Sequence, residues 1–254
     1  MKKNLLTAII TTITFASFSP VDKGKVTVAV AANMQYAMNA LKDKFENETG
    51  IKVEVILSSS GKLTQQIQEG APYDVFVSAD TKYPAELYKN KMATESPKVY
   101  AKGLLVLWTS RTDLRPKADL KMLLSADVKK IAIANPKTAP YGVAAEEALK
   151  YYGLFDQVQG KLVYGESISQ ANQYITTLAA DIGFTAKSVV LSDELKGKGT
   201  WVDIDRKVYS PISQAAVITK HGAETNKAAS EKFYAFLYSK SAREILKKFG
   251  YLVN

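Results

Sequence analysis

The most informative segment is residues 25–57, KVTVAVAANMQYAMNALKDKFENETGIKVEVIL. Its first six residues form a nearly continuous run of β-prone side chains, which is typical of a strand covered on both faces. Apolar residues then recur at helical spacing from Met34 to Phe45, and Gly50 provides a stop at the helix C-terminus. Residues 51–57 predict a second strand. The segment therefore predicts a strand–helix–strand unit, the building block of a mostly parallel sheet.

The same alternation continues along the rest of the chain, and no Ser/Pro-rich linker, repeat or low-complexity tract interrupts it. Further strands are predicted at residues 74–78, 103–109, 131–134, 182–185, 201–204 and 215–219. Further helices are predicted at residues 63–70, 142–152 and 169–179, followed by two amphipathic C-terminal stretches, 228–237 and 245–249, that would pack back on the first sheet.

We expect an α/β fold of two lobes, with a hinge and a ligand cleft between them, because strands that cross between two lobes need no flexible linker. The expected boundaries are residues 21–102 plus 212–254 for lobe 1 and residues 103–211 for lobe 2. Periodicity alone also allows one continuous open sheet.

The first 20 residues have the pattern of a secretory signal peptide: Lys2 and Lys3, a short apolar core and no acidic residue. Threonines interrupt this core, which argues against a membrane-anchoring helix, and cleavage is expected after Ala16. Because the chain has no cysteine, it cannot carry a lipidated cysteine anchor. We therefore expect a free, monomeric protein in the periplasm.

Composition excludes several chemistries. The chain has no cysteine and one histidine, His221, which removes disulfide frameworks, Cys-based zinc sites, Cys nucleophiles and iron–sulfur clusters. The formal net charge is +9, from 34 Lys and Arg against 25 Asp and Glu, and favours an anionic partner. The lysines are spread singly rather than gathered in a basic run with aromatics, so nucleic acid is not expected. A small anion fits both the charge and the expected export.

Four turns at the ends of predicted strands or the starts of predicted helices carry small or polar residues. Ligands of open α/β sheets bind at this edge, where each helix start offers backbone N–H groups without partners and the positive end of its dipole. N-capping explains any single turn, but recurrence in both lobes predicts an oxyanion site. The turns are Ala31-Ala32-Asn33, Ser58-Ser59-Ser60-Gly61, residues 135–142 and residues 165–169.

Seven blocks occur in order along the chain: VAVAAN (28–33), SSSGKL (58–63), GAPYDVFVSAD (70–80), NP (135–136), PYG (140–142), DIGF (181–184) and KFGY (248–251). Together they resemble the molybdate-binding proteins of bacterial molybdate ABC importers, which are type II periplasmic substrate-binding proteins. The resemblance covers essentially the whole mature chain.

This resemblance implies two α/β lobes that close on a bare tetrahedral oxyanion, molybdate or tungstate, and deliver it to a membrane permease. It implies no catalysis, no cofactor and no direct metal ligand, because hydrogen-bond donors hold the oxyanion. Carried over by position, Asn33 and Ser60 supply donors, and Tyr141 and Ile168 donate backbone N–H groups.

One donor of the resembled family is missing here. Some relatives add a tyrosine hydroxyl at the position that aligns with Ala186, so a backbone N–H, a water or Lys187 has to replace it. We hypothesise that Lys187 lies near the cleft and supplies positive charge, the alternative being a solvated surface lysine. Ala32 and Gly61 are secondary candidates beside the main donors.

Selectivity follows from the donors. Molybdate and tungstate are fully deprotonated at neutral pH and only accept hydrogen bonds, whereas a protonated phosphate leaves its proton without a partner at a cost of roughly 1 to 3 kcal/mol. Sulfate also only accepts, so cavity size has to reject it.

Two alternatives stay open. One is the same fold binding another anion, such as sulfate, chromate or a small organic acid, although no arginine lies in the four turns to pair with a carboxylate. The other is a serine hydrolase, because Ser59-Ser60-Gly61-Lys62 satisfies S-x-x-K; the companion motifs S-D-N and K-T-G are absent.

Overall fold

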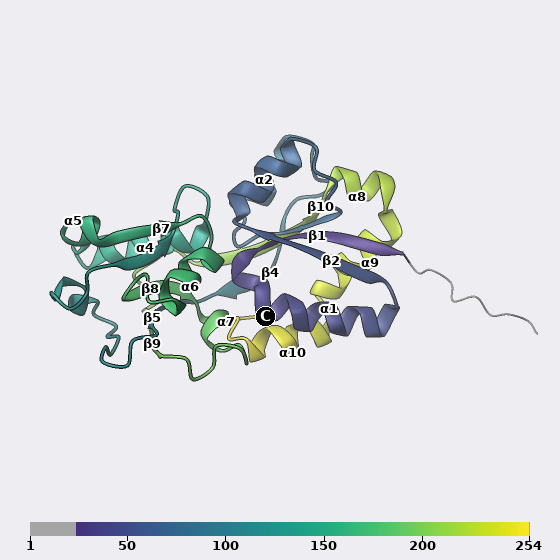
Figure 1. Ribbon diagram of the computed structural model, residues 1–254. Helices are drawn as coiled ribbons and strands as arrows, with labels where there is room; N and C mark the ends of the chain where they lie inside the picture. Colours follow the sequence, from purple (N-terminus) through teal and green to yellow (C-terminus); the bar gives the residue numbers. More distant parts are fainter. Residues whose placement is uncertain (1–23, 254) are drawn as a thin grey trace, which may run out of the picture.

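The computed structural model describes residues 24–253, in which the chain forms two five-stranded sheets flanked by helices. Figure 1 shows the two halves side by side, with the C-terminal helices back on the half that contains β1. We call the sheet containing β1 and its helices lobe 1, and the sheet containing β5 and its helices lobe 2. The predicted signal peptide, residues 1–20, lies outside the described residues.

The sheet of lobe 1 has the strand order β2-β1-β3-β10-β4. Strands β1, β2 and β3 run parallel, whereas β10 is antiparallel to both of its neighbours. The bounds are β1 Lys25–Ala31, β2 Lys52–Ser58, β3 Val75–Val77, β4 Lys98–Gly103 and β10 Ile212–Ile218.

Helices cover both faces of this sheet because side chains of β1 alternate between them. Val28 packs on the face that carries α1, α9 and α10, where Phe45 meets Phe233 with ring centroids 5.2 Å apart. Ala29 faces α2 and α3 on the opposite side. The helices are α1 Gln35–Thr49, α2 Ser60–Gln68, α3 Lys82–Lys89, α8 Lys220–Thr225, α9 Lys227–Leu237 and α10 Lys240–Lys248.

The sheet of lobe 2 has the order β7-β6-β8-β5-β9, with β6 parallel to β7 and β8 and with β5 antiparallel to β8 and β9. Its strands are β5 Leu105–Thr109, β6 Ile131–Ala134, β7 Leu162–Gly165, β8 Ile182–Ala186 and β9 Thr200–Asp203. Its helices are α4 Pro140–Tyr151, α5 Phe155–Val158, α6 Ile168–Thr176 and α7 Lys187–Val190. Short 3-10 turns complete the structure: η1 Ala32–Met34, η2 Lys121–Leu124 and η3 Gln159–Lys161.

Two short segments connect the lobes. The chain leaves lobe 1 between β4 and β5, at Leu104, and returns through residues 204–211 to β10. The predicted two-lobed α/β architecture is confirmed, and the alternative of one continuous sheet is wrong. Each sheet is mostly parallel, as expected, because four of its five strands run in the same direction. The exception is the strand that the chain forms directly after crossing between the lobes, β10 in lobe 1 and β5 in lobe 2, which is antiparallel to both of its neighbours.

The local structure differs from the prediction in one expected strand and in several elements that were not predicted. Residues 103–109 were expected to form one strand, but the chain passes from one sheet to the other at Leu104. Strands β4 and β7 and helix α3 were not predicted, whereas the two C-terminal helices pack on the first sheet as expected. None of the helices between residues 24 and 253 has the length and hydropathy that a membrane-spanning segment needs.

Candidate functional site

A narrow cavity lies where the two lobes meet, and all four predicted site residues line it. Lobe 1 contributes the end of β1 with η1, the start of α2 and the residue after Ser78; lobe 2 contributes the starts of α4 and α6. The lining residues are Ala31, Ala32, Asn33, Ser59, Ser60, Ala79, Ala139, Pro140, Tyr141 and Ile168.

Helix starts provide the polar groups of this cavity. Ser60 and Ile168 are the first residues of α2 and α6, and Tyr141 is the second residue of α4. Backbone N–H groups at these positions have no partner within their own helix, and the helix dipoles add positive potential there. Every lining side chain is neutral, so the site offers donors without formal positive charge.

Ser60 is fully buried, and a single hydrogen bond orients its hydroxyl group. The backbone N–H of Ala79 donates to Ser60 Oγ at 3.0 Å. Because this contact uses a lone pair of the hydroxyl, the hydroxyl hydrogen stays available to donate to a ligand.

The Asn33 side chain serves a different purpose. Its amide nitrogen donates to Gln214 Oε1 at 3.0 Å and to the Tyr251 hydroxyl at 3.1 Å, so both amide hydrogens already have acceptors. Its backbone carbonyl accepts the Ser188 hydroxyl of lobe 2 at 2.8 Å. The donor that Asn33 can offer a ligand is therefore its backbone N–H.

The Tyr141 side chain is likewise engaged within the protein. Gln214 Nε2 donates to its hydroxyl at 3.2 Å, and burial raises the pKa of Tyr141 well above its usual value. The phenol is therefore neutral, and the backbone N–H is the donor that Tyr141 presents. At α6, the Ser167 hydroxyl accepts the N–H of Gln170 at 3.4 Å and caps the helix whose first residue is Ile168.

Of the two secondary candidates beside the main donors, one lines the cavity and the other does not. Ala32 lines the cavity, whereas the N–H of Gly61 donates to the Thr138 carbonyl of lobe 2 at 2.9 Å and is thereby used. Ala186 is buried at the end of β8 and is not part of the cavity wall.

The structure does not bring Lys187 to this cavity, which corrects the hypothesis that it supplies charge there. Its ammonium lies 2.8 Å from the Asp203 carboxylate and over the ring of Trp201. It lines a different depression, beside the hinge segments. The carboxylate of Asp203, the last residue of β9, therefore holds the ammonium group of Lys187 away from the interlobe cavity.

The sequence singled out neither Ala79, which lies outside the four predicted turns, nor Ala139 and Ser59, which lie within them. Ala79 follows a strand that is only three residues long, and Ala139 precedes α4; neither has a side chain that signals binding. Ser59 stood in a predicted turn, but a run of three serines gives no local sign of which hydroxyl faces the ligand.

Further contacts join the lobes around the cavity. Lys62 pairs with Glu166 at 2.7 Å, and Ser169 Oγ donates to Gln35 Oε1 at 2.9 Å. The Tyr83 hydroxyl reaches the Lys137 carbonyl at 3.1 Å. The lobes are therefore closed on each other. Residues 24–253 contain no group of three or more His, Asp or Glu side chains placed to hold a metal ion.

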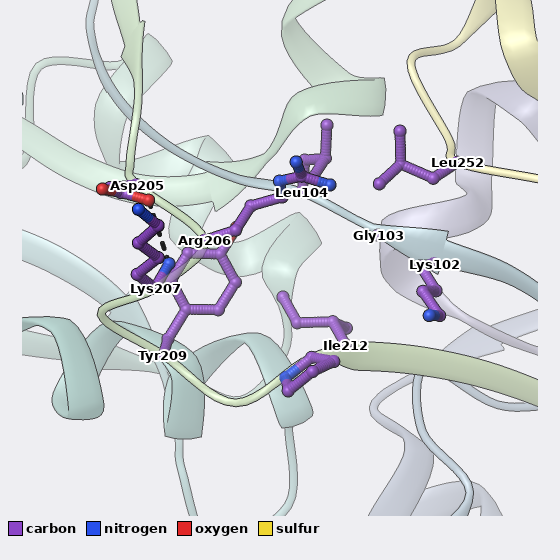
Figure 2. A pocket seen from close by; sticks show the side chains of 10 residues that line it. Lys102, Gly103, Leu104, Asp205, Arg206, Lys207, Tyr209, Ile212 and Leu252 are labelled. Atoms are coloured by element: carbon purple, nitrogen blue, oxygen red, sulfur yellow. Dashed lines mark hydrogen bonds between the residues drawn. The ribbon is translucent and has the colours of Figure 1, made fainter.

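A wider cavity lies beside the hinge segments, as Figure 2 shows. Its wall comes from β4, β10, the two crossing segments and the C-terminal segment, so no helix start directs N–H groups into it. The only hydrogen bond drawn there joins the N–H of Lys207 to Asp205 at 3.0 Å. Its wall consists of Lys102, Gly103, Leu104, Asp205, Arg206, Lys207, Tyr209, Pro211, Ile212 and Leu252.

Comparisons with known proteins agree with this geometry. A family model for bacterial extracellular solute-binding proteins matches residues 26–252. The molybdate-binding protein ModA of Rhodobacter capsulatus is 38% identical over 236 residues, which cover 92% of this chain and 91% of that protein.

Two solved structures have a fold similar to that of this chain. The periplasmic molybdate-binding protein of Azotobacter vinelandii has a TM-score of 0.85 at 35% identity, covering 90% of this chain and 99% of that one. The sulfate-binding protein SubI of Mycobacterium tuberculosis has a TM-score of 0.73 at 14% identity, covering 90% and 86%, and shows the fold alone. The predicted periplasmic binding protein fold is confirmed.

The serine hydrolase alternative is wrong. Lys62 of the S-x-x-K pattern is paired with Glu166 and is not a free base for a serine, and the proteins that resemble this chain along its length are solute-binding proteins. The chain therefore belongs to the bacterial extracellular solute-binding protein family, and it is a binding protein rather than an enzyme.

Proposed function

We propose that this chain captures molybdate or tungstate outside the cytoplasm and delivers the oxyanion to the membrane permease of an ABC importer. The observation that carries the proposal is the interlobe cavity, where four helix or turn starts converge and every lining side chain is neutral. The similarity to proteins that bind molybdate supports the same ligand.

The proposed donors are the Ser60 hydroxyl and the backbone N–H groups of Asn33, Ser60, Tyr141 and Ile168. Such donors suit an anion that only accepts hydrogen bonds, and the helix dipoles offset its charge. A protonated phosphate leaves its proton unpaired, which costs roughly 1 to 3 kcal/mol. Sulfate has shorter bonds, so donors held on packed helices cannot all reach its oxygens.

A small organic acid fits this cavity less well. A carboxylate site typically places an arginine for bidentate pairing, and no arginine lines the cavity. Arg111 is engaged instead with Asp113 and Asp181, the latter at 2.7 Å. Sulfate, chromate and organic acids are therefore comparison ligands in the test.

Delivery requires the protein to meet a permease at the membrane surface. From the pattern of residues 1–20 we infer a signal peptide, and with it a free monomer in the periplasm. We infer no lipid anchor, because the chain has no cysteine to which a lipid could be attached. Hinge motion at Leu104 and residues 204–211 would open the cavity for release.

Isothermal titration of the mature protein with molybdate, tungstate, chromate, sulfate, phosphate and a small dicarboxylate tests the ligand. We expect one-to-one binding of molybdate and tungstate, with much weaker or no heat from the others. A folded protein that gives no heat with molybdate and tungstate would overturn the proposed ligand and leave the fold assignment intact.

A further inference from the structure

Ser59 has a buried hydroxyl group that the protein itself does not use. The residue is 3% exposed, and its Oγ is among the few buried side-chain oxygens in residues 24–253 that have no hydrogen-bond partner. A buried hydroxyl without a partner costs free energy, so its presence in a well-packed region calls for a specific reason.

Helix capping does not supply that reason. Ser59 is the N-cap residue of α2, where a serine hydroxyl ordinarily accepts an N–H from the first turn. Here no such side-chain bond is formed, and the N–H of Gly61 donates instead to the Thr138 carbonyl of lobe 2 at 2.9 Å. Contact between the lobes has therefore taken one of the two N–H groups that Ser59 could cap, and its hydroxyl forms no bond to the other, that of Lys62.

The position of Ser59 supplies the reason instead. It lines the same interlobe cavity as Ser60, Tyr141 and Ile168, and the other groups around it are donors or apolar side chains. Ser60 Oγ already accepts the N–H of Ala79, and the Tyr141 hydroxyl is held by Gln214. Ser59 Oγ is thus the lining hydroxyl whose hydrogen and lone pairs are all uncommitted.

We propose that Ser59 is a ligand-binding residue whose hydroxyl donates a hydrogen bond to the oxyanion in the closed cavity. Two adjacent hydroxyl groups, those of Ser59 and Ser60, then hold the ligand from the start of α2, beside the backbone N–H groups of the other helix starts. This role rests on the proposed function, because it needs an anion between the lobes.

The test compares Ser59→Ala and Ser59→Gly with wild type, with Ser58→Ala as the matched control. Ser58 is the last residue of β2, is half-buried and does not line the cavity. Molybdate affinity is measured by titration calorimetry, and the melting temperature of each ligand-free protein by thermal unfolding. Glycine is well tolerated at an N-cap, so the second variant keeps α2 intact.

We expect both Ser59 variants to bind molybdate about 10- to 100-fold more weakly, because a hydrogen bond to a charged group is lost. Their ligand-free melting temperatures should equal or exceed that of wild type, since alanine or glycine removes an unsatisfied hydroxyl. The Ser58→Ala variant should bind within about twofold of wild type.

Three results would overturn this role, and they are distinguishable. Wild-type affinity in both Ser59 variants removes the role of Ser59 and leaves the proposed function standing. A weaker affinity that comes with a clearly lower ligand-free melting temperature in both variants shows a structural role instead. A wild-type protein that binds neither molybdate nor tungstate overturns the proposed function and this role with it.

Discussion

Ser60 and Asn33 are both buried beside the cavity, yet their hydrogen-bond partners give their side chains different tasks. The Ser60 hydroxyl accepts one N–H, from Ala79, and keeps its hydrogen for a ligand. The Asn33 side-chain amide donates its two hydrogens to Gln214 and Tyr251. Residue type alone would assign both side chains to the ligand, but the number of donors left over decides which of them can bind it.

Replacing Ser60 with alanine should weaken molybdate binding by about 1.5 to 3 kcal/mol, or roughly 10- to 150-fold, because a hydrogen bond to a charged group is lost. The variant should also melt at a lower temperature, since the N–H of Ala79 loses its acceptor. Titration calorimetry and thermal unfolding measure the two effects.

Ser192→Ala is the control for Ser60→Ala. Ser192 is equally buried and bonds to the Val189 carbonyl at 2.7 Å, away from the cavity. Its loss should lower stability while leaving affinity unchanged. Unchanged affinity in Ser60→Ala would show that the position carried over from the resembled family is wrong.

At the scale of elements, the site depends on where each helix begins. The first turn of α4 lies directly on the end of β6. The approach is so close that a Cβ at Gly142 would stand 2.1 Å from the Ala134 carbonyl oxygen and 2.9 Å from the Pro136 nitrogen. Only glycine permits this approach, and the approach sets the direction of the neighbouring N–H of Tyr141.

Gly142→Ala should therefore displace the start of α4, lower stability by about 1 to 3 kcal/mol and weaken ligand binding. Gly160→Ala is the control, since a Cβ there would meet nothing within 4 Å. Thermal unfolding and titration of both variants test this. Wild-type melting and affinity in Gly142→Ala would mean that α4 can start elsewhere without cost.

The strength of local patterns decided which elements the sequence could predict. The unit from β1 through α1 to β2 was predicted because its apolar periodicity is strong and Gly50, with φ of 72°, ends the helix. Strands β4 and β7 are edge strands in which several residues are exposed or half-buried, so neither has a long run of buried apolar residues. The division of residues 103–109 between two sheets has no local signal, because it depends on which strands each half meets.

At the scale of the whole molecule, a buried polar network joins the lobes behind the cavity. Gln214 accepts the Tyr100 hydroxyl at 2.9 Å and donates to the Tyr141 hydroxyl of lobe 2, and the Tyr251 hydroxyl lies 3.1 Å from Ser188 of lobe 2. Burial raises the pKa of Tyr100 and Tyr141 well above the usual value, and it raises the pKa of Tyr251 to about 12.

These phenols make stability depend on alkaline pH. In the unfolded chain a tyrosine loses its proton near pH 10, while in the folded protein the raised pKa keeps it neutral. The unfolded state then binds fewer protons, so the free energy of unfolding falls as pH rises from about 10 towards 12, by up to about 1.4 kcal/mol per pH unit for each phenol.

Thermal unfolding between pH 8 and pH 11.5 should accordingly show a shallower decline in Tyr251→Phe than in wild type, although this variant starts from a lower melting temperature. Tyr151→Phe, at a side chain that is 66% exposed, should decline as wild type does. Parallel declines in wild type and Tyr251→Phe would contradict the assignment of Tyr251 to this effect.

The candidate site was only partly predictable for a related reason. Helix starts are visible in sequence, and the four positions expected to donate do meet at one cavity. The partners that use up side chains are remote: Gln214 and Tyr251 lie 181 and 218 residues from Asn33. The free hydroxyl of Ser59 likewise depends on Thr138 of the other lobe, which no local pattern contains.

The sequence by itself determined that this chain alternates strands and helices in an α/β fold, that helix starts supply neutral donors, and that cysteine chemistry is excluded, whereas the division of the strands into two sheets was settled by the structure. These features follow from periodicity, capping residues and composition, which are properties of short segments. Tertiary structure alone decided which donors meet, which are already used within the protein and that Lys187 pairs with Asp203 away from the cavity. A buried donor can satisfy only one or two acceptors, and the fold decides which acceptors come within reach.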